Sequence, residues 1–214
     1  AQPEPVDYYT RALTREETTI LAERGQRQGQ RLSVHFGDLR TTQQVTGYEV
    51  RRNRDGKRLD RHELELPETT FDTEGLWLPV TGAASAAVEA AGADLPGALH
   101  AAEHAAIKLL PLYALCDKND LGGVSYPSYP PLGGPAIFIY DGHAGGVGFS
   151  RRGYAVLGHW LAATLHALRE CPCTGGCPSC IQDPQCGNAN EPLDKRGAMA
   201  LLSYWLNIRK FTSR

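Results

Sequence analysis

The sequence contains no long apolar segment. No run of about eighteen apolar residues, the minimum for a transmembrane helix, occurs in its 214 residues. Residues 1–30 also lack the basic-then-apolar order of a signal peptide. We therefore expect a cytoplasmic protein with no membrane partner. Because the chain begins at Ala1 instead of a methionine, we expect it to be a piece of a longer protein.

An excess of charge of one sign is also missing. The formal net charge is −2 and the isoelectric point is near 6.4, so the chain as a whole does not attract nucleic acid. Binding to DNA would therefore need a local basic patch or a partner domain. The clearest patch is the arginine-rich stretch at residues 51–61. A solvated hairpin tip and a phosphate-binding surface both remain open as interpretations of it.

Nucleotide-binding motifs are missing as well. Neither G-x-x-x-x-G-K-[ST] nor G-x-G-x-x-G occurs, and the glycines of "DGHAGGVGF" at residues 141–149 match neither spacing. The chain also contains no D-E-x-H box. We therefore expect that this chain alone does not hydrolyse ATP.

The patterns that are present predict an α+β fold. Alternating apolar residues in "RLSVHF" and "HELEL", with turn chemistry at residues 53–56, predict a small antiparallel β unit within residues 31–80. The chain then becomes rich in alanine. "AASAAVEAAG" predicts a short helix, and Asp94 begins a second helix that Pro111 ends or kinks.

The rest of the chain predicts one strand and two more helices. Residues 120–135 are rich in proline and glycine and predict a loop. The continuously apolar "AIFIYDG" that follows predicts a buried strand. Helices are expected at residues 151–168 and, after Asp194, at residues 195–210.

Five of the six cysteines lie in "CPCTGGCPSCIQDPQC" at residues 171–186. A disulfide framework would need an oxidising compartment and cysteines spread over the fold, and a thiol-redox site would need one isolated C-x-x-C pair. A zinc site instead needs four thiolates that converge tetrahedrally, which a C-x-x-C knuckle and flanking cysteines supply. The crowding therefore favours zinc. A site closed by four cysteines has no open position, so we expect it to be structural.

Five sulfurs compete for four positions around this metal. Cys177 and Cys180 form the knuckle, and Cys173 and Cys186 bracket it, so we expect these four to be the ligands. Cys171 stays open as an alternative ligand, because in extended backbone its side chain points the same way as that of Cys173. The loop has little apolar content, so its fold should depend on zinc.

These expectations divide the chain into two parts. Residues 1–80 are expected to be a β-rich connector with a small antiparallel β unit. Residues 81–214 are expected to form a helix-rich α/β domain that carries the four-cysteine zinc loop.

The stretch "HAAEH" at residues 100–104 supports a rival hypothesis. On a helix, H-x-x-E-H places His100 and His104 one turn apart with Glu103 beside them, as in the inverzincin proteases. A free-standing zinc hydrolase is therefore the alternative function. The two downstream glutamates, Glu170 and Glu191, are poorly placed as its third ligand. The zinc deaminase pattern fails, because the spacing is H-x-x-E and not H-x-E.

Further acidic and histidine residues follow in the same half of the chain. Asp141 at the end of the predicted strand and nearby His143 form a candidate functional pair. The full candidate polar cluster is His100, Glu103, His104, Asp117, Asp120, Asp141 and His143.

Three blocks of the chain resemble a known family. They are "LHAAEHAAIKLLPLYALCDKNDLGGVS", "AIFIYDGHAGGVGF" and "CPCTGGCPSCIQDPQCGNANEPLDKRGAMALL". In this order and at these spacings they resemble the C-terminal zinc-binding domain of superfamily 2 DNA helicases of the mitomycin repair factor (MrfA) type. The earlier stretches "VHFGDL", "VTGYEVRR" and "LPETTFDTEGLWL" are similar to the segment that precedes this domain. The resemblance covers nearly the whole chain.

This resemblance implies a role inside a larger enzyme. The parent would hydrolyse ATP with magnesium and move along single-stranded DNA in the 3′ to 5′ direction during DNA repair. Its zinc-binding domain would pack against the helicase motor domains of the same polypeptide and help to enclose the strand. The zinc ligands implied here fall among Cys171, Cys173, Cys177, Cys180 and Cys186.

Contact with DNA would use backbone phosphates and show little sequence preference. The candidate contact residues are Arg51, Arg52, Arg151, Arg152, Lys195 and Arg196. A protein-docking domain that never contacts DNA is a third hypothesis.

Overall fold

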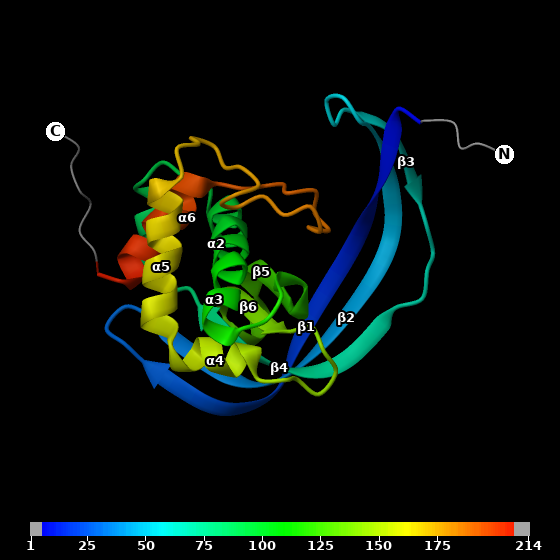
Figure 1. The fold of residues 1–214 in the computed structure, drawn as a ribbon. Coiled ribbons are helices and arrows are strands. Elements are labelled where there is room, and N and C mark those ends of the chain that lie inside the picture. The colour runs from blue at the N-terminus through cyan, green and yellow to red at the C-terminus, as the bar shows by residue number, and fades with distance from the viewer. Residues whose placement is uncertain (1–5, 208–214) are drawn as a thin grey trace.

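Six antiparallel strands form one sheet in the computed structural model, which describes residues 6–207 (Figure 1). The order across the sheet is β1-β2-β4-β6-β5, and β3 pairs with β2 beside this path. The strands are β1 (Tyr8–Gln28), β2 (Ser33–Arg52), β3 (Arg58–Glu63), β4 (Thr69–Pro79), β5 (Leu121–Tyr129) and β6 (Gly134–Asp141). The antiparallel unit predicted within residues 31–80 is therefore part of a larger sheet.

A long two-stranded ribbon dominates the N-terminal part. β1 and β2 have 21 and 20 residues and pair along their whole length. β2 pairs with β4 at residues 35–43 and with β3 at residues 47–51, so the end of the ribbon that carries β3 extends beyond the core (Figure 1). Register shifts between β1 and β2 mark irregularities at which a ribbon can bend.

The sheet curls until its two edge strands meet. The backbone N–H of Thr18 in β1 donates to the Tyr126 hydroxyl at 2.8 Å, and the Tyr129 hydroxyl donates to the Thr18 carbonyl at 3.1 Å. Both tyrosines belong to β5. An apolar cluster, separate from the core beneath the helices, fills this concave side. It consists of Leu39, Trp77, Tyr129, Ala136, Phe138 and Tyr140.

The helices cover the other face of the sheet. They are α1 (Gly82–Glu89), α2 (Leu95–Leu109), α3 (Pro111–Ala114), α4 (Phe149–Ala155), α5 (Leu157–Glu170) and α6 (Lys195–Trp205). Ile137 and Ile139 of β6 face the helical core, whereas Phe138 and Tyr140 face the concave side. This two-sided burial is what the continuous apolar run predicted. Among the described residues, no helix combines the length and apolarity needed to cross a bilayer.

Two expectations about the second half were wrong in detail. Most of the loop predicted at residues 120–135 is strand β5. Its glycines allow close packing, because a Cβ at Gly123 would lie 2.6 Å from the Ile107 side chain. The helix expected at residues 151–168 is two helices, α4 and α5, that meet at Val156.

The other predicted helices are present. α1 and α2 follow the alanine-rich segments, and Asp94 caps α2 by accepting from the Gly97 N–H. α6 begins after Asp194, and the last expected residues, 208–210, lie outside the described residues. The boundary after residue 80 stays a prediction, although β4 and β6 pair across it.

Candidate metal centres

Four sulfur atoms converge in the loop that follows α5. Cys171 and Cys173 begin this loop, and Cys177 and Cys180 lie on a turn closed by a hydrogen bond from the Cys180 N–H to the Cys177 carbonyl. The Sγ–Sγ distances are 3.5 Å between Cys171 and Cys173, 3.5 Å between Cys171 and Cys177, 3.4 Å between Cys173 and Cys180, and 3.7 Å between Cys177 and Cys180. All six cysteines of the chain are unpaired, so these contacts are not disulfides.

The spacing of the four sulfurs fits zinc. A tetrahedral site with Zn–S bonds of about 2.3 Å places its sulfurs about 3.8 Å apart. The observed separations of 3.4–3.7 Å lie close to this value. With four thiolates as ligands, no position is left for water or substrate, so the site has a structural role.

The surroundings of the cluster favour the thiolate form at Cys177 and disfavour it at Cys180. Hydrogen bonds from the Cys171 thiol and the Ser179 backbone N–H lower the pKa of Cys177 to about 6, whereas burial raises the pKa of Cys180 to about 12. The backbone N–H of Cys177 donates to Cys180 Sγ at 3.3 Å. Metal binding then has to remove the remaining thiol protons.

Lys195 supplies a positive charge next to these sulfurs. Its Nζ donates to the carbonyls of Cys171 and Cys173, each at 2.7 Å, and lies 3.4 Å from Cys173 Sγ. Only 4% of Lys195 is exposed. The expectation that Lys195 contacts DNA is therefore corrected, because its ammonium group is enclosed by the cysteine loop, residues 171–194 between α5 and α6.

The grouping of the cysteines also differs from the expectation. The fourth sulfur in the cluster belongs to Cys171, and Cys186 lies elsewhere, 3.4 Å from His100 Nε2. The turn formed by Cys177 and Cys180 folds back toward the end of α5, where Cys171 begins the loop. Residues 182–185 then lead from the turn to α2, so Cys186 lies beside that helix. The alternative ligand Cys171 thus occupies the position expected for Cys186.

A second group of metal-binding side chains surrounds Cys186. The ligand atoms of His100, His104 and Cys186 all lie within 4.8 Å of one another. His100 Nδ1 lies 2.9 Å from the Pro192 carbonyl, and His104 Nδ1 lies 2.7 Å from the Ile181 carbonyl. A carbonyl oxygen only accepts hydrogen bonds, so each Nδ1 carries the proton and each Nε2 carries a lone pair.

Burial changes the ionisation of these groups. It lowers the pKa of His100 below its ordinary value and lowers that of His104 to about 4, and the neighbouring His100 adds to the effect on His104. Burial raises the pKa of the Glu103 carboxyl to about 8. H-x-x-E-H thus forms a buried, largely uncharged group on α2 at neutral pH.

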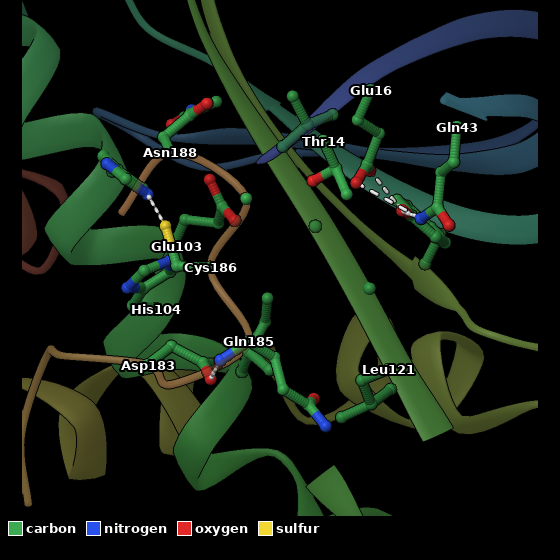
Figure 2. A pocket seen from close by; sticks show the side chains of 18 of the residues that line it. Thr14, Glu16, Gln43, Glu103, His104, Leu121, Asp183, Gln185, Cys186 and Asn188 are labelled. Atoms are coloured by element: carbon green, nitrogen blue, oxygen red, sulfur yellow. Dashed lines mark hydrogen bonds between the residues drawn. The ribbon is translucent and has the colours of Figure 1, made fainter. Parts of the chain in front are cut away.

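A pocket of about 480 Å³ opens beside this group. α2 contributes one wall, and the others come from β1, β2, β5, β6 and residues 183–188 (Figure 2). On the opposite side, the Tyr140 hydroxyl donates to Glu16, and Gln43 Nε2 donates to Glu16 at 3.3 Å. Burial raises the pKa of Glu16 to about 7. No sequence pattern pointed to Glu16 or Gln43, because the curl of the sheet brings these residues of β1 and β2 to the pocket.

Asp141 and His143 do not form a pair. The Asp141 carboxylate accepts the backbone N–H groups of residues 147–150, at 2.6–3.2 Å, and so holds the glycine loop at the start of α4. His143 Nε2 instead lies 2.9 Å from Asp120 Oδ1. Asp117 and Asp120 cap the short 3-10 helix Lys118–Asp120. These four residues therefore have local structural contacts and lie apart from the group on α2.

The candidate DNA-contact arginines are engaged with nearby groups. Arg51 pairs with Glu49 at 2.6 Å, Arg52 with Asp55 at 3.3 Å, and Arg151 with Glu74. Arg152 donates to the Tyr113 carbonyl, and Arg196 donates to the Gly92 carbonyl. The basic side chains at the β2–β3 end of the ribbon are more accessible. Within the described chain, no side-chain hydrogen bond or ion pair holds the exposed residues Arg54, Lys57 and Arg61.

A comparison with known families supports a zinc site in this chain. The family described as the MrfA Zn-binding domain matches residues 102–181. An uncharacterized protein of Methanocaldococcus jannaschii is 38% identical over 112 residues, which are 51% of this chain and all of the archaeal protein. The uncharacterized ATP-dependent helicase YprA of Bacillus subtilis is 28% identical over 82% of this chain.

A solved structure has the same fold over nearly the whole chain. The DUF1998 helicase MrfA bound to DNA matches with a TM-score of 0.62 and 25% identity over 94% of this chain. The chain spans only 26% of that helicase and 23% of YprA, so it corresponds to part of each. It spans the archaeal relative in full. Together with the tetrahedral spacing of four sulfurs, these matches show that the chain belongs to the MrfA Zn-binding domain family and that its cofactor is structural zinc.

Proposed function

We propose that this chain is a zinc-stabilised accessory domain of an ATP-dependent DNA helicase. The observation that carries the proposal is the likeness, over 94% of this chain, to part of a helicase solved with DNA. The similarity to part of YprA supports the same context. The chain contains no nucleotide-binding loop of its own, so ATP and magnesium would bind in motor domains of the same polypeptide.

In this function zinc has an architectural role. Ile181 is the fully buried aliphatic side chain of the loop, and the four cysteines themselves pack in or against the helical core. Zinc binding in small structural modules contributes on the order of 10–16 kcal/mol near neutral pH. The loop also contacts β1, because Arg11 donates to the Cys186 carbonyl at 3.2 Å. Zinc would thus help to hold this part of β1, which pairs with β2 at Glu49, against the loop and the helices.

The ribbon supplies the surface that we propose for DNA. Its β2–β3 end stands away from the helices, and Arg54, Lys57 and Arg61 are exposed there (Figure 1). Side chains without local partners are free to bind phosphates, whereas Arg51 and Arg151 would first have to leave Glu49 and Glu74. Contact of this kind follows the phosphate backbone, so it would show little preference for sequence.

Single-strand binding, 3′ to 5′ movement and a role in DNA repair complete the proposal. They rest on the family resemblance of the sequence and on the DNA-bound relative. A cytoplasmic location belongs to the same proposal.

Binding of a single-stranded oligonucleotide at two salt concentrations tests the DNA contact. Each phosphate contact contributes about 0.7 to the slope of log affinity against log salt. The Arg54→Ala/Lys57→Ala variant is expected to weaken binding several-fold and to lower this slope by about 1.4. A matched control is Arg31→Ala/Arg169→Ala, which removes two exposed arginines away from the β2–β3 end. No binding by the intact chain at low salt would favour a protein-docking domain, and equal losses in both variants would contradict a DNA contact at the β2–β3 end.

A further inference from the structure

The four-cysteine site leaves one set of metal-binding side chains unused. Cys186, on the second half of the cysteine loop, lies against α2, where Cys186 Sγ is 3.4 Å from His100 Nε2. The His104 ring lies next to the His100 ring, with centroids 4.3 Å apart. One atom from each of the three residues falls within 4.8 Å of the others. Three ligands therefore converge at a distance from the four-sulfur cluster.

The orientation of these side chains is already that of metal ligands. Metal-binding histidines commonly donate the N–H of the second ring nitrogen to a backbone carbonyl, which fixes the ring and leaves the first nitrogen free. His100 and His104 both do so through Nδ1. The backbone N–H of Asn190 lies 3.2 Å from Cys186 Sγ and donates to it, which fixes the position of the sulfur.

We propose that His100, His104 and Cys186 bind a second zinc ion, whose fourth position opens into the pocket beside α2. Two imidazoles and one thiolate suit zinc, whereas calcium and magnesium need oxygen ligands. A tetrahedral zinc places sulfur and nitrogen ligands about 3.6 Å apart, close to the 3.4 Å between Cys186 Sγ and His100 Nε2. Cysteine thus replaces the glutamate that H-x-x-E-H proteases use as third ligand.

The proposed second zinc site differs from the four-cysteine site in its access to solvent. A closed site has four protein ligands, whereas three ligands leave a position for water or a small anion. The pocket of about 480 Å³ provides that space, and Glu103 turns into it from the same helix (Figure 2). The second zinc would therefore be exchangeable and open to added ligands, unlike the first.

Zinc content of the purified chain tests this proposal. We expect two zinc ions per chain after equilibration with zinc, as measured by mass spectrometry against protein concentration. Cys186→Ser and His104→Ala should each retain one zinc. Cys116→Ser and His166→Ala are matched controls, because both residues lie outside the group, and they should retain two. One zinc in the folded wild-type chain, or two in Cys186→Ser, would overturn the proposal.

X-ray absorption of the wild-type chain covers the case in which a variant does not fold. Two sites predict an average of roughly two and a half sulfur and one and a half nitrogen or oxygen ligands per zinc, whereas the four-cysteine site alone predicts four sulfurs. Cobalt at the second site should also change its visible spectrum when azide is added, because azide can enter the open position. An all-sulfur environment without response to azide would refute the second site and leave the first intact.

Discussion

At the scale of single residues, the negative charge of the zinc-bound cysteines is balanced by a positive residue outside the cluster, Lys195. Four thiolates around Zn²⁺ carry a formal charge of −2, and a buried charge of this size needs compensation. Lys195 provides it from the first turn of α6, with its ammonium group against two carbonyls of the loop and Cys173 Sγ. The buried lysine is thus part of the metal centre.

Replacing Lys195 tests this role. Lys195→Met keeps most of the side-chain length but removes the charge, so we expect zinc affinity to fall about 10–100-fold, the range found when groups behind metal ligands are changed. Competition with a chromophoric chelator measures the affinity. Lys57→Met on the exposed ribbon is the control and should leave it unchanged. Equal affinities of Lys195→Met and wild type would contradict the role.

The raised pKa of Glu16 predicts that the stability of the chain depends on pH. Burial raises the pKa of its carboxyl from 4.5 in the unfolded chain to about 7 in the folded chain. The folded chain therefore holds a proton that the unfolded chain releases. The stability from Glu16 is complete below about pH 4.5 and is lost as the pH rises through about 7, at most about 3 kcal/mol.

Urea unfolding at pH 5.5 and 8, with excess zinc at both values, measures this effect. We expect the free energy of unfolding to fall less over this range in Glu16→Gln than in wild type. Glu17→Gln, at an exposed neighbouring position, should behave like wild type. If Glu16→Gln and wild type lose the same free energy, the carboxyl is already ionised in the folded chain.

The sequence predicts the metal more reliably than it predicts the ligands. Sulfur crowding and the C-x-x-C knuckle are local patterns, and they indicate zinc correctly. Cys171 and Cys186 cannot be ranked by spacing, because the decision depends on the direction in which residues 182–185 leave the turn. The role of Lys195 depends in the same way on how α6 docks against the loop.

At the scale of elements, the cysteine loop depends on its metal more than the sheet does. β6 and residues 73–78 of β4 pair with neighbouring strands and are buried on both faces, so their stability comes from packing. The loop between α5 and α6 instead consists of turns, and much of its contact with the core is made by the four cysteines and Ile181. Its order should be lost when zinc is removed.

Hydrogen exchange with and without a chelator tests this difference. After zinc removal, confirmed by metal analysis, we expect the amides of residues 171–191 to lose protection by at least ten-fold. The amides of β4 and β6 should keep most of theirs. Full protection of the loop in the zinc-free chain would show that packing alone holds it.

Prediction of the elements succeeded where a pattern was local. The alanine-rich helices have caps in the sequence, and β6 is an unbroken apolar run. β1 was missed because its sequence is mostly polar and its side chains are largely exposed. β5 was missed because its glycines and prolines resemble a loop, although Gly123 is required for close contact with α2. Each of these strands pairs with the next strand along the chain, so its formation depends on that pairing and not on an apolar pattern of its own.

At the scale of the whole molecule, the cysteine loop joins the helical body to the ribbon. It begins at the end of α5, crosses α2 through the carbonyls that bind His100 and His104, and reaches β1 (Figure 1). A Cβ at Gly187 would lie 1.8 Å from Thr14 Oγ1, so loop and strand are in direct contact. Zinc is therefore positioned to influence the placement of the ribbon.

The contact between the cysteine loop and the ribbon predicts that zinc affects the affinity for DNA. Removal of zinc should weaken single-strand binding several-fold, although no basic side chain of the ribbon is altered, and addition of zinc should restore it. Oligonucleotide titrations before chelation, after it and after readdition measure the effect. Unchanged affinity in the zinc-free chain would show that the ribbon is placed independently of the loop.

The central claim is that Cys171, Cys173, Cys177 and Cys180 enclose one zinc ion. A crystal structure of the purified chain with anomalous data at the zinc edge tests it most directly. We predict an anomalous peak about 2.3 Å from all four sulfurs, with Cys186 outside this shell. A peak bound by Cys186 in place of Cys171, or disulfides without a peak, would contradict the account.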